Sequence, residues 1–509
     1  MSVASRLDAL SPEQRALLEE LRRRQAARVG APSRRPPPVA PRSGRLGLGD
    51  WPLSFDQERL WRLHRDDPGM VSWNVDACSE VSGELDVARF LAAVRVVVRR
   101  HAAWRATFPL AAGRPVQRVV EFLAPEASLL DLRPLPAARR GVEARRALYD
   151  HTRRPFDLAN GPLLRLALVR LAEREHLFLL TIHHLATDWV SFQIFFRELI
   201  AAHDALAGAA AGPHGGATDL GQDALPAVQY PDFVLWERDW LQGEVLAAEQ
   251  ELWRRQLAGF PLVLELPADR PRPPVQSQRG GLCAVRAGAV RSERLRALAR
   301  AEGATPFMAM LAALAALLAG ASGRERLLIG SNGANRARPE LEPVAGCFLV
   351  QIPFACDLTG DPTFRELLAR CRRVALAAYA HQNLPFAKLI EAVAAPGTAV
   401  DRSRHPVVQV MLLVLPPQLP DGAGGLVFRP VGLYDGNSRW DLLFGLYDDA
   451  RAGLHGALEY NADVFAHQRV ERLLARLYAL LDAVVAEPDA RISRLARLAD
   501  AGAAAGGGA

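Results

Sequence analysis

The sequence predicts an α/β fold in two halves, on three observations. Residues 176–182 form a short apolar run with aromatic and β-branched members, which is typical of a buried strand. Residues 307–318 are apolar on every side of a helix, as expected for a helix inside α/β layers. Residues 207–224 are rich in Gly and Ala and contain little that can pack, so we expect them to connect the halves.

The first 48 residues predict a separate arm. Ser11-Pro-Glu-Gln14 forms a capping box, so we expect one short helix within residues 1–30. Residues 31–48 are Pro- and Arg-rich, which favours an extended, semi-rigid linker. The first 50 residues hold ten Arg and five acids, or +5 of the formal +6. The helix is either a solvated tail or a docking element. Because the positive charge lies in this arm, the sequence argues against a nucleic-acid groove on the folded body.

The segment Thr181–Ser191 (Thr-Ile-His-His-Leu-Ala-Thr-Asp-Trp-Val-Ser) carries the strongest chemical signal. It places two adjacent histidines at a strand end and Asp188 at the N-cap of the next helix. Adjacent residues on extended backbone point to opposite sides, so only one histidine should face a substrate. An imidazole titrates near neutrality and suits proton transfer. The alternative is two hydrogen-bonded core histidines and an Asp that only caps a helix.

The C-terminal half is predicted from its own boundary signals. Thr305 can cap and Pro306 can begin the apolar helix at 307–318. We expect an N-terminal lobe at 49–224, a C-terminal lobe at 225–495 and a disordered tail at 496–509, where small residues dominate the end. Five cysteines at irregular spacing suggest neither a disulfide framework nor a zinc site. The start lacks a signal core and the longest apolar run is too short for a bilayer, so we expect a cytoplasmic protein without a membrane partner.

Several segments together resemble condensation domains of nonribosomal peptide synthetases. The histidine segment resembles that family's H-H-x-x-x-D-G motif, and the other matches follow in the family's order from about residue 50 to residue 495. They are Ser54–Trp61, Arg100–Phe108, Tyr230–Trp236, Ile329–Arg336 with Gly346–Phe348, His381–Phe386, Arg404–Val410 and Pro488–Ser493. Each match alone is weak, but their shared order is specific.

The resemblance implies two chloramphenicol-acetyltransferase-like lobes that form a V-shaped pseudo-dimer with the active site in the tunnel between them. By the same match, His184 is the catalytic histidine, His183 and Asp188 orient and support it, and Arg336 pairs with Asp188 across the lobes. From the residues alone, the alternative for Arg336 is a solvated surface group, and Ser191 is either a tunnel hydroxyl or a local cap.

The implied reaction transfers an acyl, peptidyl or polyketide chain from a carrier thioester to an amine or alcohol, forming an amide or ester. The donor is a carrier protein, docked through residues 1–30 if these form a docking element. The acceptor is another carrier or a free small molecule. Substrates ride on 4'-phosphopantetheine arms, and neither a metal nor a bound cofactor is expected. In synthetases an adenylation domain usually follows, so the stop here suggests a freestanding enzyme.

Three departures and three alternatives accompany this resemblance. The motif glycine is Trp189, which alters the space beside the site or the backbone freedom there; Ala102 and Trp104 replace a Glu and a Leu, and Val350 replaces an Asn. A coenzyme A-dependent acyltransferase of the same superfamily is one alternative, although its D-F-G-W-G signature is absent and Arg439-Trp-Asp-Leu442 stands in the comparable region. A non-catalytic carrier-recruitment domain, with Trp189 plugging the tunnel, is another. An epimerisation domain ranks lowest, because no further carboxylate motif is evident.

Overall fold

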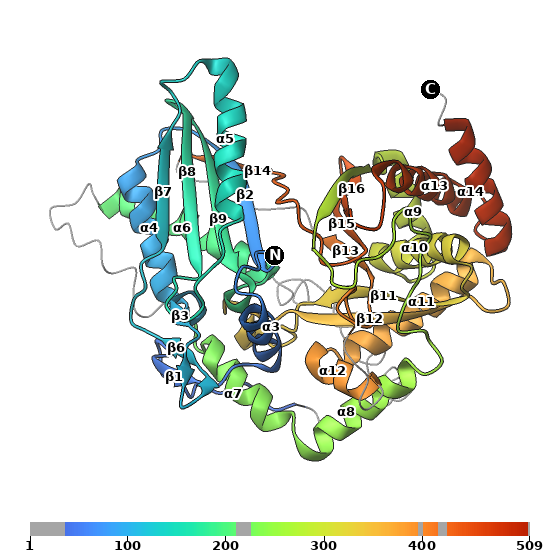
Figure 1. Cartoon of the computed structure of the whole chain (residues 1–509), viewed down its shortest axis with the longest axis horizontal. Coiled ribbons are helices and arrows are strands. Elements are labelled where there is room, and N and C mark those ends of the chain that lie inside the picture. Colours follow the sequence, from blue (N-terminus) through green and yellow to red (C-terminus); the bar gives the residue numbers. More distant parts are fainter. Residues whose placement is uncertain (1–35, 210–224, 395–400, 416–424, 507–509) are drawn as a thin grey trace, which may run out of the picture.

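The chain forms two α/β lobes arranged as a V, which confirms the predicted two-part α/β fold (Figure 1). This computed structural model describes residues 36–209, 225–394, 401–415 and 425–506. Each lobe is built on one large mixed sheet, and at the base of the V the chain crosses between the lobes through two helices, α7 (Tyr230–Trp240) and α8 (Gly243–Gln256) (Figure 1).

The N-terminal lobe is a five-stranded sheet with helices on both faces. Its order is β14-β2-β9-β8-β7, from strands Val427–Val431, Asn74–Ser82, Glu175–His183, Leu164–Ala172 and Glu126–Asp131. Leu177 and Leu179 of β9 share one cluster with helix α5 (Ala137–Thr152), whereas Phe178 and Leu180 lie in the larger core with the remaining helices. Both faces of β9 are therefore covered, which explains its continuous apolar run. The remaining helices are α3 (Phe55–Asp66), α4 (Val87–Arg100) and α6 (Trp189–Ala209).

A six-stranded sheet carries the C-terminal lobe. Its order is β10-β16-β15-β13-β11-β12, from strands Gly280–Arg286, Gly453–Asn461, Leu442–Asp449, Val410–Leu415, Arg326–Gly333 and Val350–Asp357. Its helices are α9 (Ala289–Ala301), α10 (Pro306–Ser322), α11 (Phe364–Ala380), α12 (Phe386–Val393), α13 (His467–Ala486) and α14 (Ile492–Gly506).

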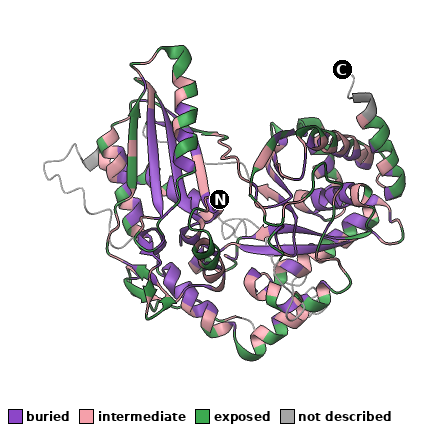
Figure 2. Ribbon diagram, viewed as in Figure 1, coloured by how far each residue is buried: buried purple, intermediate pink, exposed green. Residues whose placement is uncertain are grey.

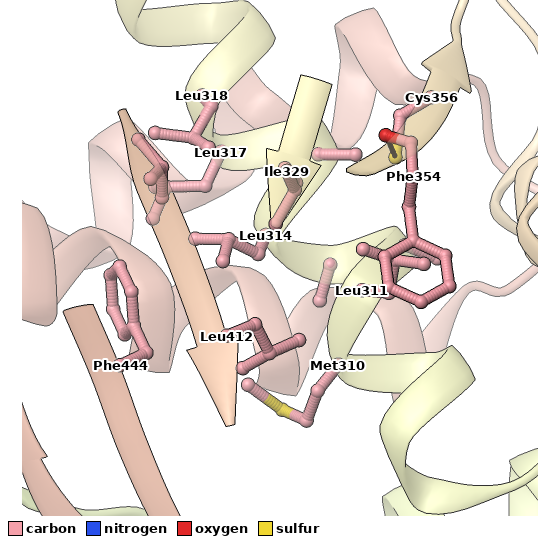
Figure 3. Packing of buried hydrophobic residues seen from close by; sticks show 14 of the residues in the cluster. Met310, Leu311, Leu314, Leu317, Leu318, Ile329, Phe354, Cys356, Leu412 and Phe444 are labelled. Atoms are coloured by element: carbon pink, nitrogen blue, oxygen red, sulfur yellow. Dashed lines mark hydrogen bonds between the residues drawn. The ribbon is translucent and has the colours of Figure 1, made fainter. Parts of the chain in front are cut away.

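Helix α10 is the apolar helix predicted from the sequence, and its predicted cap is confirmed. The Thr305 hydroxyl accepts from the Met308 amide, and Pro306 opens the helix. Every residue from Met308 to Leu318 is buried. Leu311 and Leu314 lie against the sheet, close to Ile329 and Leu412 (Figure 3). The helix is apolar all round because the sheet covers one side and other helices cover the rest (Figure 2).

The predicted boundary between residues 224 and 225 does not separate the two hydrophobic cores. Strand β14 pairs with β2, so a segment of the C-terminal half completes the N-terminal sheet. Buried side chains of α7 and of the loop before β12 also lie in the N-terminal core: Tyr230, Phe233, Trp236, Leu341, Val344 and Phe348. Composition alone predicts this boundary, and composition does not reveal long-range strand pairing.

The structure tests the predictions for the two ends of the chain only in part. The predicted helix within residues 1–30 lies outside the described residues. Residues 36–48 of the predicted linker are held against the body, with the Pro37 carbonyl accepting from Trp236 Nε1 at 2.8 Å and the Ser43 amide donating to Asp232. The predicted disorder from residue 496 is wrong as far as Gly506, because α14 packs on α13 through Ala499 and the pair Arg476–Asp500 at 2.6 Å.

Within the described ranges, no helix by itself is long and apolar enough to cross a bilayer; the bent pair α9 and α10 passes the same test of length and composition. All five cysteines are buried and unpaired. No cluster of three or more potential metal ligands occurs among the described side chains.

Candidate active site between the lobes

At the end of strand β9, one histidine is buried in the core and the next is partly exposed. The strand is the one predicted at 176–182, and it ends at His183, where a short 3-10 turn, η2 (His184–Ala186), begins. The His183 amide donates to the Leu163 carbonyl at 2.9 Å and the His184 amide to the Trp73 carbonyl at 2.8 Å. His183 is 1% exposed, whereas His184 is the partly exposed member of the pair. The pair therefore divides as the alternation along a strand predicts.

His183 is a packed core residue. Its Nδ1 accepts from the Leu185 amide at 3.2 Å, which leaves the ring hydrogen on Nε2. The ring lies edge-on to His64, with 5.8 Å between the centroids, and to Phe156, with 6.0 Å. Burial lowers the pKa of His183 well below its ordinary value. This imidazole is thus neutral and fixes the turn that carries His184.

His184 lies among residues of both lobes. Its ring is edge-on to Trp73 of the N-terminal lobe at 5.8 Å, and its Nδ1 is 3.9 Å from the Cys347 sulfur. This contact lies on the Nδ1 side of the ring, and no described side chain forms a hydrogen bond with Nε2.

The surroundings of His184 keep its imidazole neutral. Burial lowers its pKa to about 4, and the cation of Arg439 adds to that effect. The Asp188 carboxylate acts in the opposite direction but is outweighed. At neutral pH the ring therefore holds no second proton and can accept one.

The turn after His184 is braced by the chain's opening motif. The Gln57 amide group donates to the Leu185 carbonyl at 2.9 Å and to Gln117 at 3.0 Å. Gln57 is held in turn by a capping box with Ser54 at the start of α3. The buried bond to the Leu185 carbonyl therefore fixes the backbone directly after His184.

Asp188 joins the lobes instead of facing a substrate. Its Oδ2 accepts from Arg336 Nη1 at 2.5 Å and from the Phe348 amide at 3.2 Å, and its Oδ1 accepts from the Ser191 amide at 2.9 Å. The last bond confirms the predicted helix cap. The Asp188 and Arg336 side chains are 3% and 4% exposed. Arg336 is therefore a buried cross-lobe partner, and the surface alternative is wrong.

Ser191 completes this connection. Its hydroxyl donates to Asp188 at 2.8 Å and receives the Gly346 amide at 3.0 Å and Arg336 Nη2 at 3.2 Å. The residue is fully buried, so it serves as more than a local cap. We call Asp188, Ser191, Arg336 and Gly346 the latch.

Gly346 allows the latch to close against the ring of Tyr230. A Cβ at this position would lie 2.0 Å from Tyr230 Cδ2, which no side chain tolerates. Gly346→Ala should therefore destabilise the fold by about 1–3 kcal/mol through overpacking, measured as the midpoint of urea unfolding. Gly432→Ala is the control, because its Cβ would meet nothing within 4 Å. Equal midpoints for the two variants would contradict this account.

Trp189, in the place of the motif glycine, also spans the gap between the lobes. Its ring centroid is 6.3 Å from that of Tyr447 on β15, and its Nε1 is buried without a hydrogen-bond partner. It is the first residue of α6 and directly follows Asp188. The substitution thus adds an aromatic contact between the lobes beside the site.

Three residues near His184 were not predicted as site residues. Cys347 lies inside the matched stretch Gly346–Phe348, and Arg439 lies inside the stretch Arg439–Leu442 noted above, so a signal existed for both. Trp73 belongs to none of the matched motifs. Its role depends on the pairing of β2 with β9, which places residue 74 opposite residue 183.

The sequence matches the model of the Condensation domain family over residues 48–505. A linear gramicidin synthase of Brevibacillus parabrevis is 38% identical over 447 residues, which are 87% of this chain and 8% of that protein. Phosphinothricin tripeptide synthetase PhsB of Streptomyces viridochromogenes is 36% identical over 497 residues, 95% of this chain and 40% of that protein. The chain thus spans a minor part of each of these relatives.

Solved structures of related domains also match this chain. The X-domain from teicoplanin biosynthesis is 31% identical, with a TM-score of 0.77 over 90% of this chain and 99% of that one. The condensation domain of the monacolin K polyketide synthase has a TM-score of 0.75 at 21% identity, over 87% and 99% of the two chains, which shows the shared fold. With the family model covering nearly the whole chain, the protein belongs to the condensation domain family of nonribosomal peptide synthetases, with two chloramphenicol-acetyltransferase-like lobes.

Proposed function

We propose that this chain transfers an acyl group from a carrier-borne thioester to an amine or alcohol, with His184 as the proton acceptor. The observation that carries the proposal is a neutral, partly exposed imidazole between the lobes whose Nε2 is unengaged. His183, Asp188 and Arg336 would hold that ring in place. The thioester would be presented on the phosphopantetheine arm of a donor carrier protein.

The bonds and protons of this reaction balance without any other group from the protein. The acceptor nitrogen or oxygen attacks the thioester carbonyl, the new C–N or C–O bond forms, and the C–S bond breaks. The acceptor's proton passes to Nε2 and then to the departing thiolate sulfur. An amine is nucleophilic before it loses a proton, so positioning supplies much of the acceleration. An alcohol depends on proton removal as it attacks.

Incubation with acyl-loaded donor carriers and free acceptors tests the proposal, with the product identified by mass spectrometry. A new amide or ester that requires this chain would support it. Turnover with acyl-coenzyme A but with no carrier would instead support the coenzyme A-dependent alternative.

The pH profile with an alcohol acceptor should report the low pKa of His184. Because that pKa lies at about 4, the imidazole remains unprotonated on going from pH 8 to pH 6, and the ester-forming rate should stay flat. A histidine at its ordinary pKa of about 6.5 would lose roughly fourfold in rate by pH 6. Such a loss, reversed by returning to pH 8, would contradict the assignment.

A second candidate function is recruitment of a partner protein without turnover. It is supported by the 31% identity to the teicoplanin X-domain, another structure of which is a complex with OxyB. Trp189 supports it as well, because this side chain fills space beside the site that the family motif leaves to a glycine.

Trp189→Gly separates the two candidates. If Trp189 blocks turnover, the unmodified chain should bind carriers but form no product, and the variant should gain product. If the chain is a catalyst, the unmodified protein should already form product and the variant should change acceptor size preference by about 10-fold. Product mass on the carrier and carrier affinity are the two measurements.

A further inference from the structure

Beside His184 lies a guanidinium whose charge no described residue pairs. Arg439 precedes β15, and its Cζ lies 4.7 Å from the centroid of the Trp73 ring and 5.0 Å from that of Trp440. Its Nη1 is buried and has no hydrogen-bond partner. The described part of the chain offers it no ion pair within 4.0 Å.

Arg439 and His184 share one neighbour. The Trp73 ring has the guanidinium over it and the imidazole at its edge, 5.8 Å away between ring centroids. Arg439 is also the charge that acts most strongly on His184. The cation therefore lies close to His184, the proposed proton acceptor.

A second guanidinium increases the excess of positive charge. Arg59 of α3 lies 5.4 Å from the Trp73 centroid and 5.7 Å from that of Phe386. Unlike Arg439, it has a carboxylate, Asp56 Oδ1, at 3.5 Å. The two guanidinium groups beside Trp73 repel each other. Burial lowers the pKa of Arg439, which has no carboxylate partner among the described residues to offset its desolvation.

The nearest carboxylates do not neutralise Arg439. Glu459 on β16 and Asp435 act on it only from beyond ion-pair distance. Burial raises the pKa of Glu459 to about 7, so this group carries only part of a negative charge at neutral pH. Asp435 is engaged by the backbone and side-chain nitrogens of Asn437 at 3.0 and 2.6 Å.

We propose that Arg439 binds a carboxylate of the substrate, next to the reacting atoms at His184. The guanidinium's unpaired donors suit a planar carboxylate, and Trp73 and Trp440 would hold it in orientation while excluding water. This inference rests on the proposed acyl transfer only for the identity of the molecule that carries the carboxylate. The carboxylate belongs either to the acceptor, as in a free amino acid, or to the far end of the acyl chain.

Binding tests the site without requiring turnover. The probes are N-butanoylglycine and its primary amide, titrated calorimetrically into the full-length chain. The carboxylate should bind about 10- to 100-fold more tightly than the amide, which is the usual strength of a buried charged hydrogen bond. Arg439→Gln should remove that preference, and Arg439→Lys should retain part of it. Arg429→Gln, an exposed arginine of β14, should leave it intact.

Turnover then identifies which substrate carries the carboxylate. One arm compares glycine with glycinamide as acceptors, and the other compares succinyl- with butanoyl-pantetheine as donors. Each compound's kcat/KM is compared between wild type and Arg439→Gln, so the acceptor's own amine pKa cancels. The loss should fall on the carboxylate-bearing member of one arm.

Three results would overturn the proposal. These are equal binding of carboxylate and amide to the wild type, a preference that survives in Arg439→Gln, and equal loss of turnover for charged and neutral substrates. An equal loss of turnover would indicate that Arg439 acts on every thioester substrate, whether or not the substrate carries a carboxylate. A binding preference without any turnover would retain the site and count against the catalytic function alone. Arg439→Gln should fold normally, because the lost side chain has an unpaired donor.

Discussion

His184→Ala should slow ester formation far more than amide formation. Proton transfer is worth about 10²- to 10⁴-fold, and we expect the amide-forming rate to fall near the lower figure and the ester-forming rate near the upper. The physical reason is the acceptor. An α-amine of pKa about 7.7 to 8.0 is partly neutral at pH 7 and attacks through its lone pair, whereas an alcohol must lose its proton during attack.

The measurement is the initial rate of product formation on the same acyl-loaded carrier, with an amine and an alcohol of similar size. His467→Ala is the matched control, because that histidine lies on α13 with an exposed side chain and contacts Tyr460 instead of the site. It should leave both rates unchanged. Equal losses with the two acceptors in His184→Ala would remove His184 from proton transfer and leave it a positioning role.

The site could be predicted from the sequence where its geometry is local. The order strand, histidines, capping Asp and helix is encoded within Thr181–Ser191, because alternation along a strand and helix capping act over a few residues. The structure places these residues as expected, with His183 inside and His184 partly exposed. Arg336 was assigned to Asp188 through the family resemblance, since 148 residues separate the two.

The remainder of the site depends on contacts that no local pattern encodes. Trp73 reaches His184 only because β2 pairs with β9. Arg439 reaches Trp73 because the chain leaves the C-terminal lobe, adds β14 to the N-terminal sheet and returns to β15. Because β14 belongs to the N-terminal sheet, a single boundary at the Gly- and Ala-rich segment 207–224 does not divide the chain into its two lobes.

The tail carries a local signal for a helix. Leu495 and Ala499 are four residues apart and both buried, which is the spacing of a helix that packs along one face. The small residues that suggested disorder do not prevent this helix, because Ala is the best helix former.

The latch explains how a V-shaped pair of lobes keeps one geometry at the site. A buried ion pair adds little net stability over an apolar pair, but breaking it strands a charge. Asp188 accepts from Arg336 Nη1, the Phe348 amide, and the amide and hydroxyl of Ser191, so four donors from three residues converge on one carboxylate. The carboxylate follows His184 by four residues, so a change in lobe orientation would move the imidazole.

Arg336→Met should therefore destabilise the protein by about 3–5 kcal/mol, because it leaves the Asp188 carboxylate buried without its cation. Asp188→Asn combined with Arg336→Met should recover part of this loss, since the remaining side chain is neutral. Arg118→Met is the matched control: Arg118 pairs with Asp50 at 2.7 Å, but the two side chains are 45% and 40% exposed, and such a pair is worth about 0–1 kcal/mol. Urea unfolding followed by tryptophan fluorescence measures all three. If Arg336→Met and Arg118→Met shifted the midpoint equally, Asp188 and Arg336 would not hold the lobes together, and the geometry of His184 would have to be maintained by the turn and Gln57 alone.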